Sequence, residues 1–170
     1  MKRRRRVQLG EMLTITFENT DTMRFQVQEM ARAERMSSDE QIAQELAVYN
    51  ELIPDEEELS ATLFVEITDK DALREWLPKL VGIQRALSVD LGDAGIVQAT
   101  ASEEFLTREE DATSAVHYLK FAFTADQARA LAEDPAALVV DHPAYEVRVP
   151  LADDVRRELA GDLGALASTT

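Results

Sequence analysis

The sequence predicts an α+β fold with a largely antiparallel sheet, and two patterns support this prediction. Near the N-terminus, apolar residues recur at every second position, which is the period of a half-buried strand. Further along the chain, strand-like segments alternate with segments of helical period and with hairpin turns. Strands that are joined partly by hairpins and partly by helices are typical of an α+β domain with packed helices.

The N-terminal part predicts a three-stranded antiparallel β-meander. Apolar and polar residues alternate over residues 7–9, 13–17 and 23–27, and turn residues separate these segments. A helix that starts at Thr22 is the competing interpretation of the third segment. We place the change from strand to helix near Gln28. A second helix is expected to open at the capping-box pattern Ser38-x-x-Gln41 and to bury Ile42, Leu46 and Tyr49.

The second half predicts further strands that alternate with helices. Strands are expected over residues 61–67, 87–91, 96–100, 115–123, 138–141 and 145–149. Helices are expected after the cap Thr68-Asp69, after the capping box Thr124-x-x-Gln127, and around Val155, Leu159 and Leu163. This order comes near a ferredoxin-like arrangement with one added strand, which makes the second half a candidate for that topology.

Length and charge predict one domain with a polarised surface. The 170 residues suit a single domain over residues 1–170, with a frayed C-terminus over residues 164–170. The formal net charge is -15, yet residues 2–6 hold five of the 18 basic residues. We therefore expect residues 1–6 to form a basic N-terminal arm on an acidic body.

Several classes of function are excluded by composition and by missing motifs. The chain has no Cys, so thiol catalysis, Cys-held zinc and iron–sulfur ligation by this chain are excluded. Its acidity argues against nucleic acid as the main ligand, and no apolar run reaches the roughly 20 residues of a spanning helix. No nucleophile elbow, Walker loop or dinucleotide-binding glycine motif occurs. No apolar stretch of a secretory signal follows the basic run, so we expect a cytoplasmic protein.

The two histidines are the first candidates for a chemical site. His117 lies on the apolar face of its predicted strand and His142 precedes a proline, so a buried structural histidine and a rigid turn are the preferred interpretations. Alternatively, the two imidazoles and a carboxylate, Glu66 or Glu29, would form a site for Fe(II), Mn(II) or Zn(II). The spacing of these residues matches no short metal-binding motif.

A second candidate site is the polar cluster of Arg24, Gln28, Glu29 and Arg32. Two arginines could clamp a carboxylate or a phosphate, with Glu29 as a general base. The alternative, which we prefer, is local pairing along one helix face, with Glu29 and Arg32 as an ion pair at a spacing of three residues.

Several strings occur together in an order that resembles a known family. They are Arg4-Arg5-Arg6-Val7, Leu13-Thr14, Phe17-Glu18-Asn19, Gln26-Val27-Gln28-Glu29-Met30, Tyr49-Asn50, Ile53-Pro54, Ser114-Ala115-Val116-His117 and Asp141-His142-Pro143-Ala144-Tyr145. The set resembles the bacterial family labelled domain of unknown function 3501, from Arg3 to about Leu163. The resemblance implies a soluble bacterial protein of a family without an assigned activity. It also implies neighbours, because members are often encoded beside rubrerythrin-like and iron–sulfur oxidoreductase proteins.

Three functions follow as hypotheses. The first is a non-catalytic accessory protein that works with an iron–sulfur oxidoreductase or a rubrerythrin-like partner, which suits a sequence without catalytic motifs. The second is a metal-dependent enzyme or sensor that uses His117, His142 and Glu66. The third is a small binder of anionic ligands that uses Arg24 and Arg32.

Overall fold

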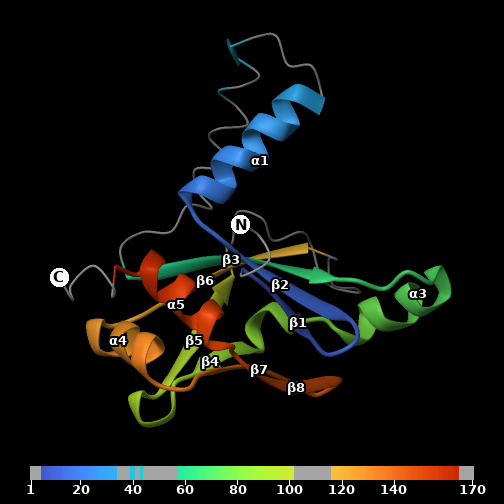
Figure 1. Cartoon of the computed structure of the whole chain (residues 1–170). Coiled ribbons are helices and arrows are strands. Elements are labelled where there is room, and N and C mark those ends of the chain that lie inside the picture. The colour runs from blue at the N-terminus through green and yellow to red at the C-terminus, as the bar shows by residue number, and fades with distance from the viewer. Residues whose placement is uncertain (1–4, 34–38, 41–42, 44–56, 102–115, 165–170) are drawn as a thin grey trace.

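The computed structural model describes residues 5–33, 39–40, 43, 57–101 and 116–164 of the chain. These residues form a mixed structure of helices and strands (Figure 1). The strands are β1 (Arg6–Leu9), β2 (Leu13–Glu18), β3 (Glu58–Val65), β4 (Leu87–Asp90), β5 (Ile96–Ala101), β6 (Val116–Ala122), β7 (Ala137–His142) and β8 (Tyr145–Pro150). The helices are α1 (Thr20–Ala33), α3 (Lys70–Lys79), α4 (Ala125–Glu133) and α5 (Asp153–Asp162), with short 3₁₀ turns η2 (Ile83–Arg85) and η3 (Gly92–Ala94).

Within the described residues, the strands form one antiparallel sheet of eight strands. Their order is β1-β2-β3-β6-β5-β4-β7-β8, and every neighbouring pair is antiparallel. The two end strands approach each other, because the Tyr145 hydroxyl of β8 donates a hydrogen bond to the Leu9 carbonyl of β1. The Met12 N–H donates to the same hydroxyl at 3.3 Å. The sheet is therefore curled into a nearly closed barrel.

One face of the sheet carries the hydrophobic core. Alternate residues of β2, β3 and β6 point to this face, as the period of two predicts. Phe17 and Phe121 meet there with ring centroids 6.1 Å apart. Leu131 of α4 and Leu159 of α5 belong to the same core, so these two helices cover this face of the sheet (Figure 1). Helix α1 instead leaves the end of β2 on the other side of the sheet and extends away from it (Figure 1).

Most of the predicted elements outside α1 are confirmed. The Asp69 carboxylate caps α3 by accepting from the Ala72 N–H, and Thr124 and Gln127 form the predicted capping box of α4. The predicted hairpin of β4 and β5 pairs in antiparallel fashion around Gly92–Ala94. The helix predicted from Ser38 lies outside the described residues, apart from Asp39, Glu40 and Ala43. No helix among the residues that the structure describes is long and apolar enough to cross a membrane.

The third strand of the predicted meander is wrong. Residues 23–27 belong to α1, which begins at Thr20, close to the competing interpretation. Met23 and Val27 are four residues apart, so they share a side of a helix as readily as a face of a strand. The cap at Asn19 decides between the two: its carbonyl accepts the first helical hydrogen bond from the Met23 N–H at 3.0 Å.

Two further expectations change. The strands that α3 connects, β3 and β4, have two strands between them in the sheet, and so do the strands that α4 connects, β6 and β7. In a ferredoxin-like arrangement, the two strands that a helix connects have one strand between them. The strand order of this sheet therefore departs from that arrangement. The basic arm predicted over residues 1–6 does not include its last two residues, because Arg6 begins β1 and Arg5 is buried at 2% exposure, while residues 1–4 lie outside the described residues.

Candidate functional site

Helix α1 presents the predicted polar cluster as an exposed row. Arg24, Gln28 and Arg32 are four residues apart from one another in turn, so they lie along one side of the helix, and all three are exposed. Arg32 donates to Glu29 at 2.9 Å, which confirms the predicted local ion pair. Arg24 makes no ion pair with any residue in the described ranges. The helix thus brings the four predicted residues together on its surface.

The length of this row indicates which kind of binding partner it matches. Arg24 and Arg32 are eight residues apart, which is about 12 Å along a helix that rises 1.5 Å per residue. At that span, two guanidinium groups share the oxygens of one small carboxylate only if both side chains extend toward each other along the helix. A row of this length fits an extended surface that carries several acceptors, and the 78% exposure of the Arg32 side chain leaves it available to such a surface.

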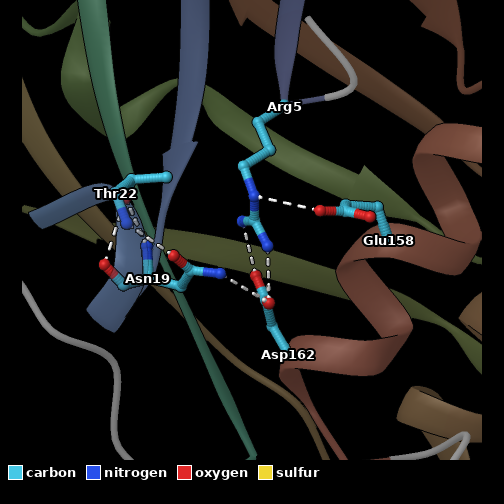
Figure 2. A network of polar contacts seen from close by, with 5 residues as sticks. All are labelled: Arg5, Asn19, Thr22, Glu158 and Asp162. Carbon is cyan, nitrogen blue, oxygen red and sulfur yellow. Dashed lines mark hydrogen bonds and ion pairs between the residues drawn. The ribbon is translucent and has the colours of Figure 1, made fainter. Parts of the chain in front are cut away.

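The N-terminus of α1 is capped by two reciprocal hydrogen bonds between Asn19 and Thr22. The Thr22 N–H donates to Asn19 Oδ1 at 2.9 Å, and the Asn19 N–H donates to Thr22 Oγ1 at 2.8 Å. Thr22 is fully buried, so this cap is shielded from water. Asn19 also donates through Nδ2 to Asp162 of α5 at 3.2 Å (Figure 2). The first turn of α1 is therefore fastened to a helix on the opposite face of the sheet.

Arg5 completes this network from the N-terminal strand. Its guanidinium donates to both oxygens of Asp162, at 2.7 and 2.6 Å, while its Nε lies 3.3 Å from Glu158 (Figure 2). Such a two-pronged pair orients both groups as well as attracting them. We call Arg5, Asn19, Asp162 and Glu158 the anchor network. It joins the residue before β1, the start of α1 and the helix α5.

Electrostatics keep Arg5 charged in its buried position. Burial alone lowers the pKa of Arg5, but the hydrogen bonds and the charge of Asp162, helped by the charges of Glu158 and Glu18, outweigh it and raise that pKa. An uncompensated charge at such a depth would cost several kcal/mol. The negative groups around Arg5 are therefore a condition for its burial.

The residues predicted to hold a metal are placed separately. His117 is buried on β6, where it pairs across from Leu63, and β6 is separated from the His142 strand β7 by β5 and β4. Three strand spacings correspond to about 14 Å along the sheet. Glu66 is exposed and accepts from Arg6 at 2.6 Å. Among the residues that the structure describes, no group of three His, Cys, Asp or Glu side chains could hold a metal ion. The metal site stays a prediction.

His142 serves the turn between β7 and β8. Its Nε2 lies 2.8 Å from the Val81 carbonyl, which can only accept, so Nε2 carries the proton. Its Nδ1 accepts from the Ala144 N–H at 3.0 Å. Both ring nitrogens are thus engaged with the backbone, in agreement with the preferred interpretation of a rigid turn.

A surface hollow of about 590 Å³ lies elsewhere, beside η3 and the ends of β7 and β8. Arg148 and Asp90 face each other there at 2.6 Å. The hydrogen bond from Arg148, with a second from the Gly92 N–H, lowers the pKa of Asp90. The hollow contains none of the residues that the sequence predicts for a site.

The anchor network was not predicted from the sequence. Arg5 belongs to a basic run that reads as a solvated arm, and Asp162 is one of 33 acidic residues. One signal was present: Asn19 followed by Thr22 has the spacing of a helix cap. It indicates where α1 begins, but nothing in the sequence pairs residue 5 with residue 162.

Comparisons with known proteins find a matching family model and a similar solved structure. The model of a family described as "Protein of unknown function (DUF3501)" matches residues 1–163. A crystal structure of a novel protein of unknown function from Burkholderia pseudomallei K96243 is similar, with 36% sequence identity and a TM-score of 0.88. The alignment covers 95% of this chain and 85% of that chain. A search of curated proteins finds no match.

Proposed function

Because the chain belongs to the DUF3501 family of proteins of unknown function, we propose a role from its own geometry: it is a non-catalytic accessory protein that docks through α1 onto an acidic surface of a redox partner. The observation that carries this proposal is the exposed row of Arg24, Gln28 and Arg32 on a helix that extends away from the sheet (Figure 1). The partner class, an iron–sulfur oxidoreductase or a rubrerythrin-like protein, comes from the family resemblance.

Charge complementarity supports an acidic partner. The chain as a whole carries a net charge of -15, so most of its surface repels an acidic protein. The row on α1 is a local exception with two guanidinium groups and a neutral amide, in which Arg32 is paired with Glu29 and Arg24 has no ion-pair partner among the described residues. A cationic row on an acidic body selects the orientation in which the partner approaches, since other orientations bring like charges together.

The anchor network supports the same role by holding α1 in a defined direction. Asp162 of α5 binds both Asn19, at the start of α1, and Arg5, the residue before β1. A docking element whose orientation is set before binding loses less conformational entropy when the complex forms. The network therefore contributes to the affinity without touching the partner.

The test measures binding of the full-length chain to purified partners. One iron–sulfur oxidoreductase and one rubrerythrin-like protein are each titrated in a biosensor with the wild type and with the double variant Arg24→Glu and Arg32→Glu. We expect the variant to bind at least tenfold more weakly and to lose the salt dependence of the association rate, because rim charges act mainly on that rate.

A matched control uses arginines on other helices. Arg74 of α3 is exposed, and Arg129 of α4 is 65% exposed and pairs with Asp126 three residues away, as Arg32 pairs with Glu29. The double variant Arg74→Glu and Arg129→Glu adds the same charge and should bind like the wild type. Equal weakening by both double variants, or no binding of either partner class to the wild type, would overturn the proposal.

A further inference from the structure

The face of the sheet opposite the core is polar, yet it is buried. On this face, Thr16 pairs across from Thr62, and Glu18 pairs across from Ser60. Their exposed fractions are 8% for Thr16, 5% for Thr62, 7% for Glu18 and 2% for Ser60. A solvated sheet face carries exposed polar side chains, and a packed one carries apolar side chains. A buried face lined with hydroxyl groups and a carboxylate fits neither description, because polar groups removed from water need hydrogen-bond partners.

Glu18 carries on this face a buried oxygen that lacks a hydrogen-bond partner. Its Oε2 is buried and accepts no hydrogen bond within the described part of the chain. A buried carboxylate oxygen without a donor is costly, because nothing offsets its loss of hydration. Ser60 lies directly across from Glu18, which places the two Cβ atoms about 4.5–5.5 Å apart, and Thr62 is the diagonal neighbour. The unpartnered oxygen thus lies beside two hydroxyl groups.

Among the residues that the structure describes, the charges around Glu18 leave an excess of negative charge. Arg5 is the guanidinium near Glu18, but it is already bound to Asp162 and lies beside Glu158. Lys120, the next residue across from Ser60, is 3.2 Å from Glu58, and these two charges balance each other. Three carboxylates therefore share the single charge of Arg5, which favours a further cation at this position.

We propose that the polar face formed by Glu18, Ser60 and Thr62 binds a small ligand through a primary ammonium group. An ammonium group carries one positive charge and three donors. One donor satisfies Glu18 Oε2, and the others match the hydroxyl oxygens of Ser60 and Thr62, which accept as well as donate. The ligand class is a small aliphatic amine. This site is independent of the proposed docking role of α1.

The test uses amines of known structure as probes. The thermal unfolding of the full-length chain and isothermal titration calorimetry are followed with 1,4-diaminobutane and n-butylamine, at constant ionic strength. Tetramethylammonium, a cation without N–H donors, and 1-butanol, a neutral molecule of similar size, serve as controls. We expect the two amines to raise the Tm and to release or absorb heat with a saturating profile, and we expect the controls to do neither.

Substitutions on the polar face test whether the amines bind there. Glu18→Gln keeps the size of the side chain and removes its charge, so it should weaken amine binding at least tenfold, while Glu11→Gln, at an exposed position of the β1–β2 turn, should not weaken it. Ser60→Ala and Thr62→Val, which keep Glu18, should each weaken it roughly two- to tenfold, as expected for one lost neutral hydrogen bond. If Glu18→Gln fails to fold, the Ser60→Ala and Thr62→Val variants still show whether the amine binds at this face. An equal response to tetramethylammonium, or equal binding by these face variants and Glu11→Gln, would overturn the proposal.

Discussion

At the scale of single residues, Arg5 is the side chain on which most of the polar structure depends. It is 2% exposed, and its partner Asp162 has a side chain that is 10% exposed. A buried ion pair is a weak reason for stability when it is compared with an apolar replacement of both partners. Removal of one partner is different, because it leaves the other charge buried without compensation.

We therefore predict that Arg5→Met lowers the free energy of unfolding by about 3–5 kcal/mol. Urea denaturation followed by circular dichroism measures this change. Arg6→Met is the matched control, since Arg6 is the next residue and its pair with Glu66 is exposed, at 56% and 42%. The control should lose less than about 1 kcal/mol. Equal losses of stability in the two variants would show that the buried pair of Arg5 and Asp162 does not stabilise the fold more than an exposed ion pair does.

The histidines show how far a residue can be understood from its neighbours in sequence. The apolar alternation around His117 predicted its burial, and the proline after His142 predicted a turn. Both expectations agree with the structure, because each depends on residues within a few positions. The hydrogen bond from His142 to Val81 spans 61 residues, and no local pattern indicates it.

At the scale of elements, α1 shows where a local pattern is ambiguous. Alternation over residues 23–27 is compatible with a strand, and a helix with Met23 and Val27 on one side explains the same residues. Side chains four residues apart are neighbours on a helix, and side chains two or four apart share a face of a strand. The cap at Asn19 and its contact with Asp162 favour the helix, which the alternation alone does not distinguish from a strand.

We predict that Asn19→Ala lowers the free energy of unfolding by about 1–2 kcal/mol, since it removes a helix cap. It also removes the hydrogen bond to Asp162, so the amide hydrogens of α1 should exchange faster with deuterium. Thr124→Ala removes the corresponding cap of α4 and is the matched control. That control should cost a similar or smaller free energy and should leave the exchange of α1 unchanged. Unchanged exchange in Asn19→Ala would contradict the role of the cap.

At the scale of the whole molecule, the Tyr145 side chain links the two end strands of the nearly closed sheet. The Tyr145 hydroxyl bridges the Leu9 carbonyl and the Met12 N–H at the β1–β2 turn. Gly10 lies in this turn with φ +77°, and a Cβ atom at this position would overlap the Tyr145 hydroxyl. A glycine is therefore needed here for space as well as for conformation.

We predict that Gly10→Ala destabilises the protein by about 1–3 kcal/mol more than Gly82→Ala does. Gly82 has a similar φ of +89° and no atom within 4 Å of an added Cβ, so the comparison separates the steric effect from the backbone strain. The difference is measured by thermal and urea unfolding of both variants. Equal losses of stability would show that the Tyr145 side chain moves aside for the added Cβ atom without destabilising the protein.

The sequence by itself determined the α+β class, the positions of most strands, the caps of α3 and α4, and the family. These features depend on residues close together in the chain, whose period and spacing are visible without the fold. Only the tertiary structure decided the order of the strands, the near closure of the sheet by Tyr145, and the anchor network. Each of these joins residues that are far apart in sequence, up to 157 positions for Arg5 and Asp162. The polar face around Glu18 belongs to the same group. The alternation over residues 13–17 places Thr14 and Thr16 on one face, and only the tertiary structure shows that Glu18 joins them and that this face is buried.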